Sequence, residues 1–183
     1  MKNDKVPGLF SYVVEHDAGF APHPFGSYCT LAHCKFSRNG KARNIVELAG
    51  VEDWILGTGG ASTRSAGHGK IVYAMKVTEK MTLAEYQKDK RFVKRRDNFQ
   101  CDRMTERFVL ISEQFYYFGK SNVELGKKFS ELEKRGPKFK NRFDSKLILD
   151  FTEWIQKNFK TGIHGKSCEG TKIKCKCKTI CSK

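Results

Sequence analysis

Short runs of β-branched and aromatic residues, separated by glycine-rich or charged stretches, fill the first two thirds of the chain. Runs of this kind predict β-strands. We expect strands at residues 9–14, 28–34, 53–57, 70–77, 107–112 and 115–118. The last two are separated by so few residues that a tight turn should join them.

Helical signals lie between and after these runs. Residues 44–49 can form one or two helical turns. Thr82–Glu85 and Ser121–Glu124 have the spacing of capping boxes, which predict one helix at about residues 83–89 and another that ends before Gly136. Asp144 can cap a third helix that reaches about residue 159 and carries an apolar stripe, which should pack against the core. The stripe consists of Leu147, Ile148, Phe151, Trp154, Ile155 and Phe159.

This order of elements indicates an α+β fold in a single domain, residues 1–163, followed by a lysine- and cysteine-rich tail, residues 164–183. A chain of 183 residues can bury a hydrophobic core without disulfides. The sequence has no run of about 18 apolar residues and no leader-like first segment. We therefore expect a cytoplasmic protein with reduced cysteines and no membrane partner.

The net charge adds a first indication of function. The 35 lysines and arginines outnumber the 20 aspartates and glutamates, which gives a formal charge of +15. A field of this sign concentrates polyanions near the surface, so nucleic acid is the first partner to consider. A lysine-rich surface without such a role remains the alternative.

Several short sequence motifs occur together in a fixed order. They include Phe10–Val14, Asp17–Pro22, Tyr28–Ala32, Asp53–Gly59 and Gly69–Met75. In this combination they resemble the nucleotide modification associated domain of the second type. The resemblance implies a role beside systems that modify or hypermodify DNA bases, with DNA, more than RNA, or a nucleotide as the ligand. Other components of such a system are then expected partners.

A second similarity concerns the fold. Residues 44–92 show the order helix, Asp-Trp strand, glycine-rich loop, strand and short helix, which is similar to the small barrels of the PUA, ASCH and EVE type. This similarity implies a small, mixed, partly closed β-barrel with flanking helices and a C-terminal helical segment. A likeness of fold says little about function by itself.

The glycine-rich stretch 57–69 is the first candidate for binding chemistry. Glycines let backbone N–H groups approach a phosphate, and hydroxyl, guanidinium and imidazole groups supply further hydrogen bonds. The stretch has neither a Walker A nor a dinucleotide-binding pattern, and a solvated connection remains the alternative. The predicted phosphate-binding residues are Thr58, Gly59, Gly60, Ser62, Arg64, His68 and Lys70, together with Lys35.

The second candidate is a wall of aromatic side chains on which a base could stack. Two prolines stiffen the loop that carries two of these side chains, and polar groups beside the wall could contact the edge of a base. The same aromatics could equally belong to the core. The predicted base-binding residues are Tyr12, Phe20, Phe25, Tyr28 and Trp54, with Cys29 and Thr30 beside them.

The tail contains soft ligands of the kind that zinc prefers, and neighbouring lysines should lower the pKa of its thiols. The spacing lacks the Cys-x2-Cys pairs of common zinc sites. A structural zinc and a basic tail that attracts phosphates therefore stay open as alternatives, and no other cofactor is expected. The predicted ligands are His164, Cys168, Cys175, Cys177 and Cys181.

Two functions fit these observations. The first is a binding module of a DNA base-modification or anti-phage system that recognises a modified base or nucleotide. The alternative is an enzyme that processes or modifies a nucleotide or base, in which Asp17 would be the leading general base. A scaffold that recruits partners through its charge is a third reading.

Overall fold

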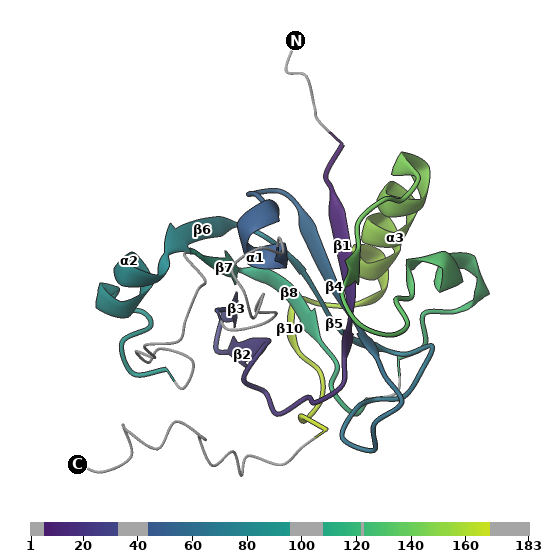
Figure 1. Ribbon diagram of the computed structural model, residues 1–183, viewed down its shortest axis with the longest axis horizontal. Helices are drawn as coiled ribbons and strands as arrows, with labels where there is room; N and C mark the ends of the chain where they lie inside the picture. Colours follow the sequence, from purple (N-terminus) through teal and green to yellow (C-terminus); the bar gives the residue numbers. More distant parts are fainter. Residues whose placement is uncertain (1–5, 33–43, 96–107, 122, 169–183) are drawn as a thin grey trace.

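The computed structural model describes residues 6–32, 44–95, 108–121 and 123–168, and the chain is built around two β-sheets (Figure 1). Sheet A contains, in spatial order, β10 (Gly162–Ile163), β8 (Gln114–Tyr117), β5 (Ile71–Lys76), β4 (Trp54–Gly59), β1 (Leu9–Val14) and β9 (Phe139–Lys140). Sheet B contains β2 (His23–Phe25), β3 (Tyr28–Leu31), β7 (Phe108–Ser112) and β6 (Glu79–Thr82). The helices are α1 (Ile45–Leu48), α2 (Leu83–Lys88), the 3-10 helix η1 (Lys127–Leu132) and α3 (Ser145–Asn158).

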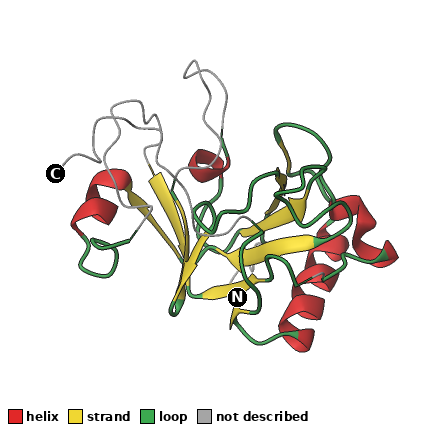
Figure 2. Cartoon of the chain, turned by 90° about the horizontal axis from the view of Figure 1, so that it is seen from below, coloured by secondary structure: helices red, strands yellow, loops and turns green. Residues whose placement is uncertain are grey.

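The two sheets lie between helices, with α2 on one side and α3 on the other (Figure 2). A central apolar layer fills the space between the sheets, a second layer lies between sheet A and α3, and a third lies between sheet B and α2. Strands β1 and β4 are buried along their whole length. Burial on both faces explains why their sequences are mostly apolar, with only the small polar residues Ser11 and Thr58 among them.

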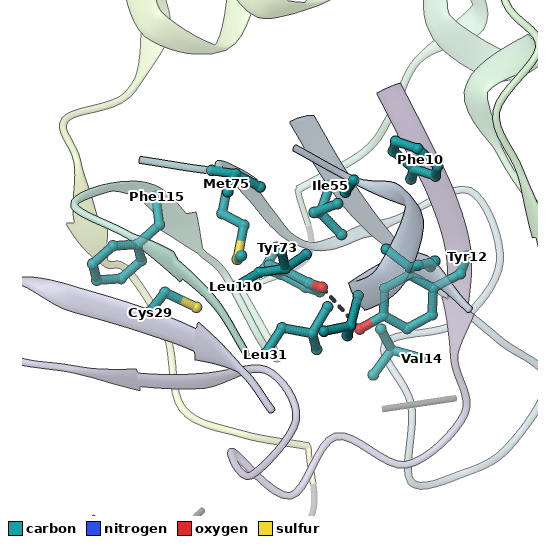
Figure 3. Packing of buried hydrophobic residues seen from close by; sticks show 14 of the residues in the cluster. Phe10, Tyr12, Val14, Cys29, Leu31, Ile55, Tyr73, Met75, Leu110 and Phe115 are labelled. Carbon is teal, nitrogen blue, oxygen red and sulfur yellow. Dashed lines mark hydrogen bonds between the residues drawn. The ribbon is translucent and has the colours of Figure 1, made fainter. Parts of the chain in front are cut away.

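The central layer is built from alternate residues of its strands (Figure 3). On β1, Phe10, Tyr12 and Val14 belong to this layer. Tyr12 and Tyr73 meet edge to face, and their hydroxyl oxygens lie 2.8 Å apart in a hydrogen bond. Each buried phenol thus has a hydrogen-bond partner inside the core, as buried polar groups usually do.

Most elements predicted from the sequence are confirmed. All six predicted strands are present, as β1, β3, β4, β5, β7 and β8. Helix α2 begins with the predicted capping box, in which the side chains of Thr82 and Glu85 each accept a backbone N–H of the other. Helix α3 begins at the predicted cap Asp144 and packs its apolar stripe on sheet A. The α+β class is thus confirmed.

The helix predicted to begin at Ser121–Glu124 is wrong. The backbone there pairs with the start of β5 instead: Ile71 N–H donates to Val123 O at 2.8 Å, and Glu124 forms a β-bridge with Lys70. The helical part of this region is the 3-10 helix η1. A capping box indicates where a helix can start, but pairing with a neighbouring strand outweighs that local preference.

The partly closed barrel is not confirmed. In the described part of the chain the two sheets have no strand in common, and neither sheet closes on itself. Strand β6 escaped prediction because its residues are mostly polar, and strands β2, β9 and β10 because none of them is longer than three residues. Runs this short lack the alternation by which a strand is identified.

The helices of the described residues are short. The longest of them, α3, has 14 residues, whereas a bilayer span needs about 20. No helix in this part of the chain combines the length and the apolar character that crossing a membrane requires.

Gly57 provides the space for the Tyr12–Tyr73 pair. A Cβ atom at position 57 would lie 2.3 Å from Tyr73 Cε1 and 2.8 Å from Val14 Cγ2. We predict that Gly57→Ala lowers the free energy of unfolding by about 1–3 kcal/mol, as overpacking of a core does, measured by urea denaturation. Gly50→Ala is the matched control, because its Cβ would meet nothing closer than 3.9 Å. Equal losses in the two variants would contradict the prediction.

Candidate functional site

The loops that follow β1 and β4 meet at one edge of sheet A. These two strands are parallel neighbours, with Leu9–Val14 paired along Trp54–Gly59, so their carboxyl ends lie side by side (Figure 1). The carboxyl edge of parallel strands is a common place for ligand sites in proteins. We call residues 15–22 and 60–69 the loop pair.

Three contacts join the two loops into one surface. Asp17 N–H donates to Arg64 O at 3.1 Å, and Ser62 N–H donates to Glu15 Oε2 at 3.2 Å. On the exposed rim, Arg64 Nη2 lies 3.4 Å from His16 Nε2. A guanidinium, an imidazole and a hydroxyl are thereby gathered at one place.

The glycine-rich loop has a defined shape of its own. Gly60 N–H donates to Ser65 Oγ at 2.8 Å, and the Ser65 hydroxyl donates to Val14 O. Gly59 lies directly under the loop backbone, since a Cβ there would be 2.0 Å from Gly67 O. Several N–H groups that could bind a phosphate are therefore already used within the fold.

The far end of this loop is held by Glu133. Gly69 N–H donates to Glu133 Oε1 at 2.8 Å, Arg135 Nη2 lies 3.0 Å from Oε2, and His68 Nδ1 lies 3.5 Å from Oε1. Burial alone would raise the pKa of Glu133, but the hydrogen bonds from Gly69 and Arg135 outweigh it and leave this pKa below its ordinary value. These residues line a cavity of about 350 Å³ beside η1.

Asp17 is a buried carboxylate that joins three segments of the chain. Its side chain accepts hydrogen bonds from Tyr117 Oη at 2.7 Å and Gly19 N–H at 3.3 Å through Oδ1, and from Cys168 N–H at 3.0 Å through Oδ2. Asp17 is 1% exposed. Burial, followed by the charge of Asp17, raises the pKa of Tyr117, which keeps its hydroxyl protonated as the donor. The predicted general-base role of Asp17 stays a prediction.

Residues 162–168, which we call the docked segment, run along sheet A to the loop pair. Strand β10 pairs in parallel with β8, His164 N–H donates to Tyr117 O at 2.8 Å, and Lys120 N–H donates to Lys166 O at 2.9 Å. The sequence placed residues from 164 onward in the tail. The first five of these residues, 164–168, are instead bound to the fold.

Cys168 lies in a different environment from the one expected for a tail thiol. Burial, followed by the charge of Asp17, raises the pKa of Cys168 to about 11. His164 Nε2 lies 2.6 Å from Lys160 O. Among the described residues, no group of three His, Cys, Asp or Glu side chains is arranged to hold a metal ion. The zinc site stays a prediction, because its other ligands lie outside the described residues: Cys175, Cys177 and Cys181.

The predicted base-binding residues are distributed over different layers. Tyr12 and Cys29 lie in the central layer between the sheets. Trp54 lies on the opposite face of sheet A, in the layer under α3, where it stacks on Tyr116. Adjacent strands thus direct these aromatics to opposite faces of one sheet.

The remaining members of that set lie elsewhere. Phe25 and Tyr28 pack on the outer face of sheet B, and buried Thr30 accepts a hydrogen bond there from the Tyr86 hydroxyl at 3.4 Å. Phe20 is half-buried in the loop pair. The structure therefore does not gather the predicted aromatics into one wall, and Phe20 is the member that belongs to the loop pair.

Four of the predicted phosphate-binding residues belong to the loop pair: Gly60, Ser62, Arg64 and His68. Thr58 is buried in β4, and its hydroxyl donates to Tyr12 O at 3.3 Å. Lys70 precedes β5, at the bridge to Glu124. Lys35 lies outside the described residues.

A protein-family model described as nucleotide modification associated domain 2 matches residues 6–108 and 97–173. The chain belongs to this family. The resemblance that the short sequence motifs indicated is thereby confirmed. No curated protein and no solved structure matches the chain.

In this nucleotide modification associated domain, sequence reasoning missed two residues that complete the site. Tyr117 is 100 positions from Asp17, and Glu133 is 64 positions from Gly69. No local pattern connects partners so far apart. Only the order of strands in sheet A, once known, places Tyr117 beside the loop pair.

The charge of Asp17 should be measurable at the neighbouring thiol. We predict that Asp17→Asn lowers the pKa of Cys168 from about 11, because the substitution removes a negative charge that opposes the thiolate. The pH dependence of iodoacetamide alkylation at Cys168, followed by peptide mass spectrometry, measures this pKa. Glu15→Gln removes another carboxylate of the loop pair and should leave it unchanged. An unaltered profile in Asp17→Asn would contradict the prediction.

Proposed function

We propose that this protein is a binding module of a DNA base-modification system and that it recognises a modified base or nucleotide through the loop pair. Its family supports the context. The observation that carries the proposal is the meeting of the two loops at His16 and Arg64, whose side-chain nitrogens lie 3.4 Å apart on the exposed rim. Two segments more than forty residues apart thus present polar groups to the same ligand.

The chemistry of the rim fits a nucleotide. The guanidinium of Arg64 offers a planar set of donors that matches a phosphate or the edge of a base. His16 and Ser62 add groups that donate or accept hydrogen bonds. Phe20, in the same loop as His16, has an aromatic ring of the kind on which bases stack. The charge of +15 raises the local concentration of such anionic ligands.

The surroundings of Asp17 favour a binding role over general-base catalysis. A general base must reach the proton that it removes. Both carboxylate oxygens of Asp17 instead accept hydrogen bonds from within the fold, and the residue is 1% exposed. The enzyme alternative requires turnover of a nucleotide, which Asp17→Asn should abolish while binding is retained.

We predict that Arg64→Gln weakens binding of a base-modified oligonucleotide about tenfold or more, since a hydrogen bond to a charged group is worth about 1.5–3 kcal/mol. Fluorescence anisotropy with matched oligonucleotides, unmodified and carrying a 5-hydroxymethyl pyrimidine, measures both affinity and selectivity. The same titrations are made with mononucleotides and over a series of salt concentrations, because phosphate contacts make affinity fall as salt rises.

The control for this substitution is Lys157→Gln, which removes one positive charge from the exposed face of α3. It should leave affinity and selectivity at the wild-type level. If Arg64→Gln behaves like Lys157→Gln, or if the wild-type protein binds neither the oligonucleotides nor the mononucleotides, the proposed function is wrong.

A further inference from the structure

A second positive surface lies on the outer side of sheet B, next to the segment that follows α2. Within residues 88–95 five side chains are basic, one is acidic, and all five basic ones are exposed. The basic residues are Lys88, Lys90, Arg91, Lys94 and Arg95. We call this segment, together with the rings beneath it, the arginine–aromatic surface.

Aromatic rings hold the two arginines of this surface in place. The guanidinium carbon of Arg95 lies 4.1 Å from the ring centroid of Phe25, and that of Arg91 lies 4.7 Å from Phe92 and 5.8 Å from Tyr28. The rings support each other, with centroids of Phe25 and Phe92 6.0 Å apart. Cation–π contacts of this kind orient a guanidinium and lower the entropy lost when it binds a ligand.

The two arginines differ in the ion pairs that they form. Arg91 forms ion pairs with Glu79 at 2.9 Å and with Asp89 at 2.7 Å, so it fastens the segment to β6. Among the described residues, Lys88, Lys90, Lys94 and Arg95 form no such ion pair. Their charges are therefore the ones available to an anionic partner.

Strand β2 connects this surface to the loop pair. His23 Nδ1–H donates to Gly19 O of the loop pair at 2.9 Å, while the His23 ring lies 5.0 Å from the ring of Phe25. At about 3.3 Å per residue, the three residues of β2 span roughly 10 Å. A polynucleotide held at the loop pair could therefore continue along β2 toward Arg95, which lies over the ring of Phe25.

We propose that the arginine–aromatic surface binds the phosphate backbone of single-stranded DNA that flanks a nucleotide held at the loop pair. This inference rests on the proposed function and narrows its ligand to a polynucleotide. A base read at a protein site must leave the double helix, so the neighbouring nucleotides are unpaired as well. Positively charged surfaces that include aromatic rings and stacked arginines are typical of proteins that bind single strands.

The test compares two triple variants of the full chain. Lys90→Gln/Lys94→Gln/Arg95→Gln removes three charges from the arginine–aromatic surface. Lys128→Gln/Lys146→Gln/Lys157→Gln removes three charges from η1 and α3, on the other side of sheet A. Each is titrated with a fluorescent 12-nucleotide single strand, with the same sequence as a duplex, and with a mononucleotide, over a salt series.

For single strands the slope of log affinity against log salt is about −0.7 per phosphate contact. Removal of three contacts should therefore make the slope of the first variant shallower by about 2. This variant should also bind the strand more than tenfold more weakly at low salt. Its affinity for the mononucleotide should stay within twofold of wild type. The second variant should keep the wild-type slope. Equal slopes in the two variants, or tighter binding of the duplex than of the single strand, would overturn the inference.

A single substitution tests the role of the stacked guanidinium. Arg95→Lys keeps the charge but loses the planar contact with Phe25, so its affinity for the single strand should fall between those of wild type and Arg95→Gln. Affinity equal to wild type would show that charge alone acts there. The two proposals fail separately: if Arg64→Gln abolishes selectivity while the first triple variant changes nothing, only this inference fails.

Discussion

The buried carboxylate of Asp17 fixes the geometry of the whole carboxyl edge. A charge removed from water is tolerable only when hydrogen bonds compensate it. The donors come from Tyr117 on β8, from Gly19 in its own loop and from Cys168 in the docked segment. Because each of these bonds is needed, the segments that supply them cannot shift independently, and the loop that carries His16 is held in one position.

The parallel pairing of β1 and β4 supplies the second constraint. It places the glycine-rich loop beside the loop anchored by Asp17, and small residues then permit close approach: Gly59 lies under Gly67, and Gly57 leaves room for Tyr73. The glycines in this stretch therefore act first on packing. Their N–H groups bind protein atoms at Gly60 and Gly69, so side chains are left to contact a ligand.

Local signals in the sequence predicted the elements well, since each depends on neighbouring residues. The capping box at Thr82, the cap at Asp144 and the apolar run of β1 are examples. The site was predicted only in part, because Asp17 and Arg64 stand out locally while their distant partners do not. The aromatic wall failed for a definite reason: Tyr12 and Trp54 lie on opposite faces of one sheet, which the register between β1 and β4 determines.

Two acidic groups near this edge, Asp17 and Glu133, are bound internally, and this limits the acceptors that they offer to a ligand. Asp17 is occupied by Tyr117 and backbone N–H groups, and Glu133 by Gly69 and Arg135. A carboxylate that accepts such bonds contributes little free acceptor capacity at the surface. Arg64 and, across β2, Arg95 then define the exposed chemistry. Arg64 is oriented by His16 of the neighbouring loop, and Arg95 is oriented by the ring of Phe25. Two such arginines, one on each side of β2, suit the binding of an extended polynucleotide strand better than the enclosure of a small molecule.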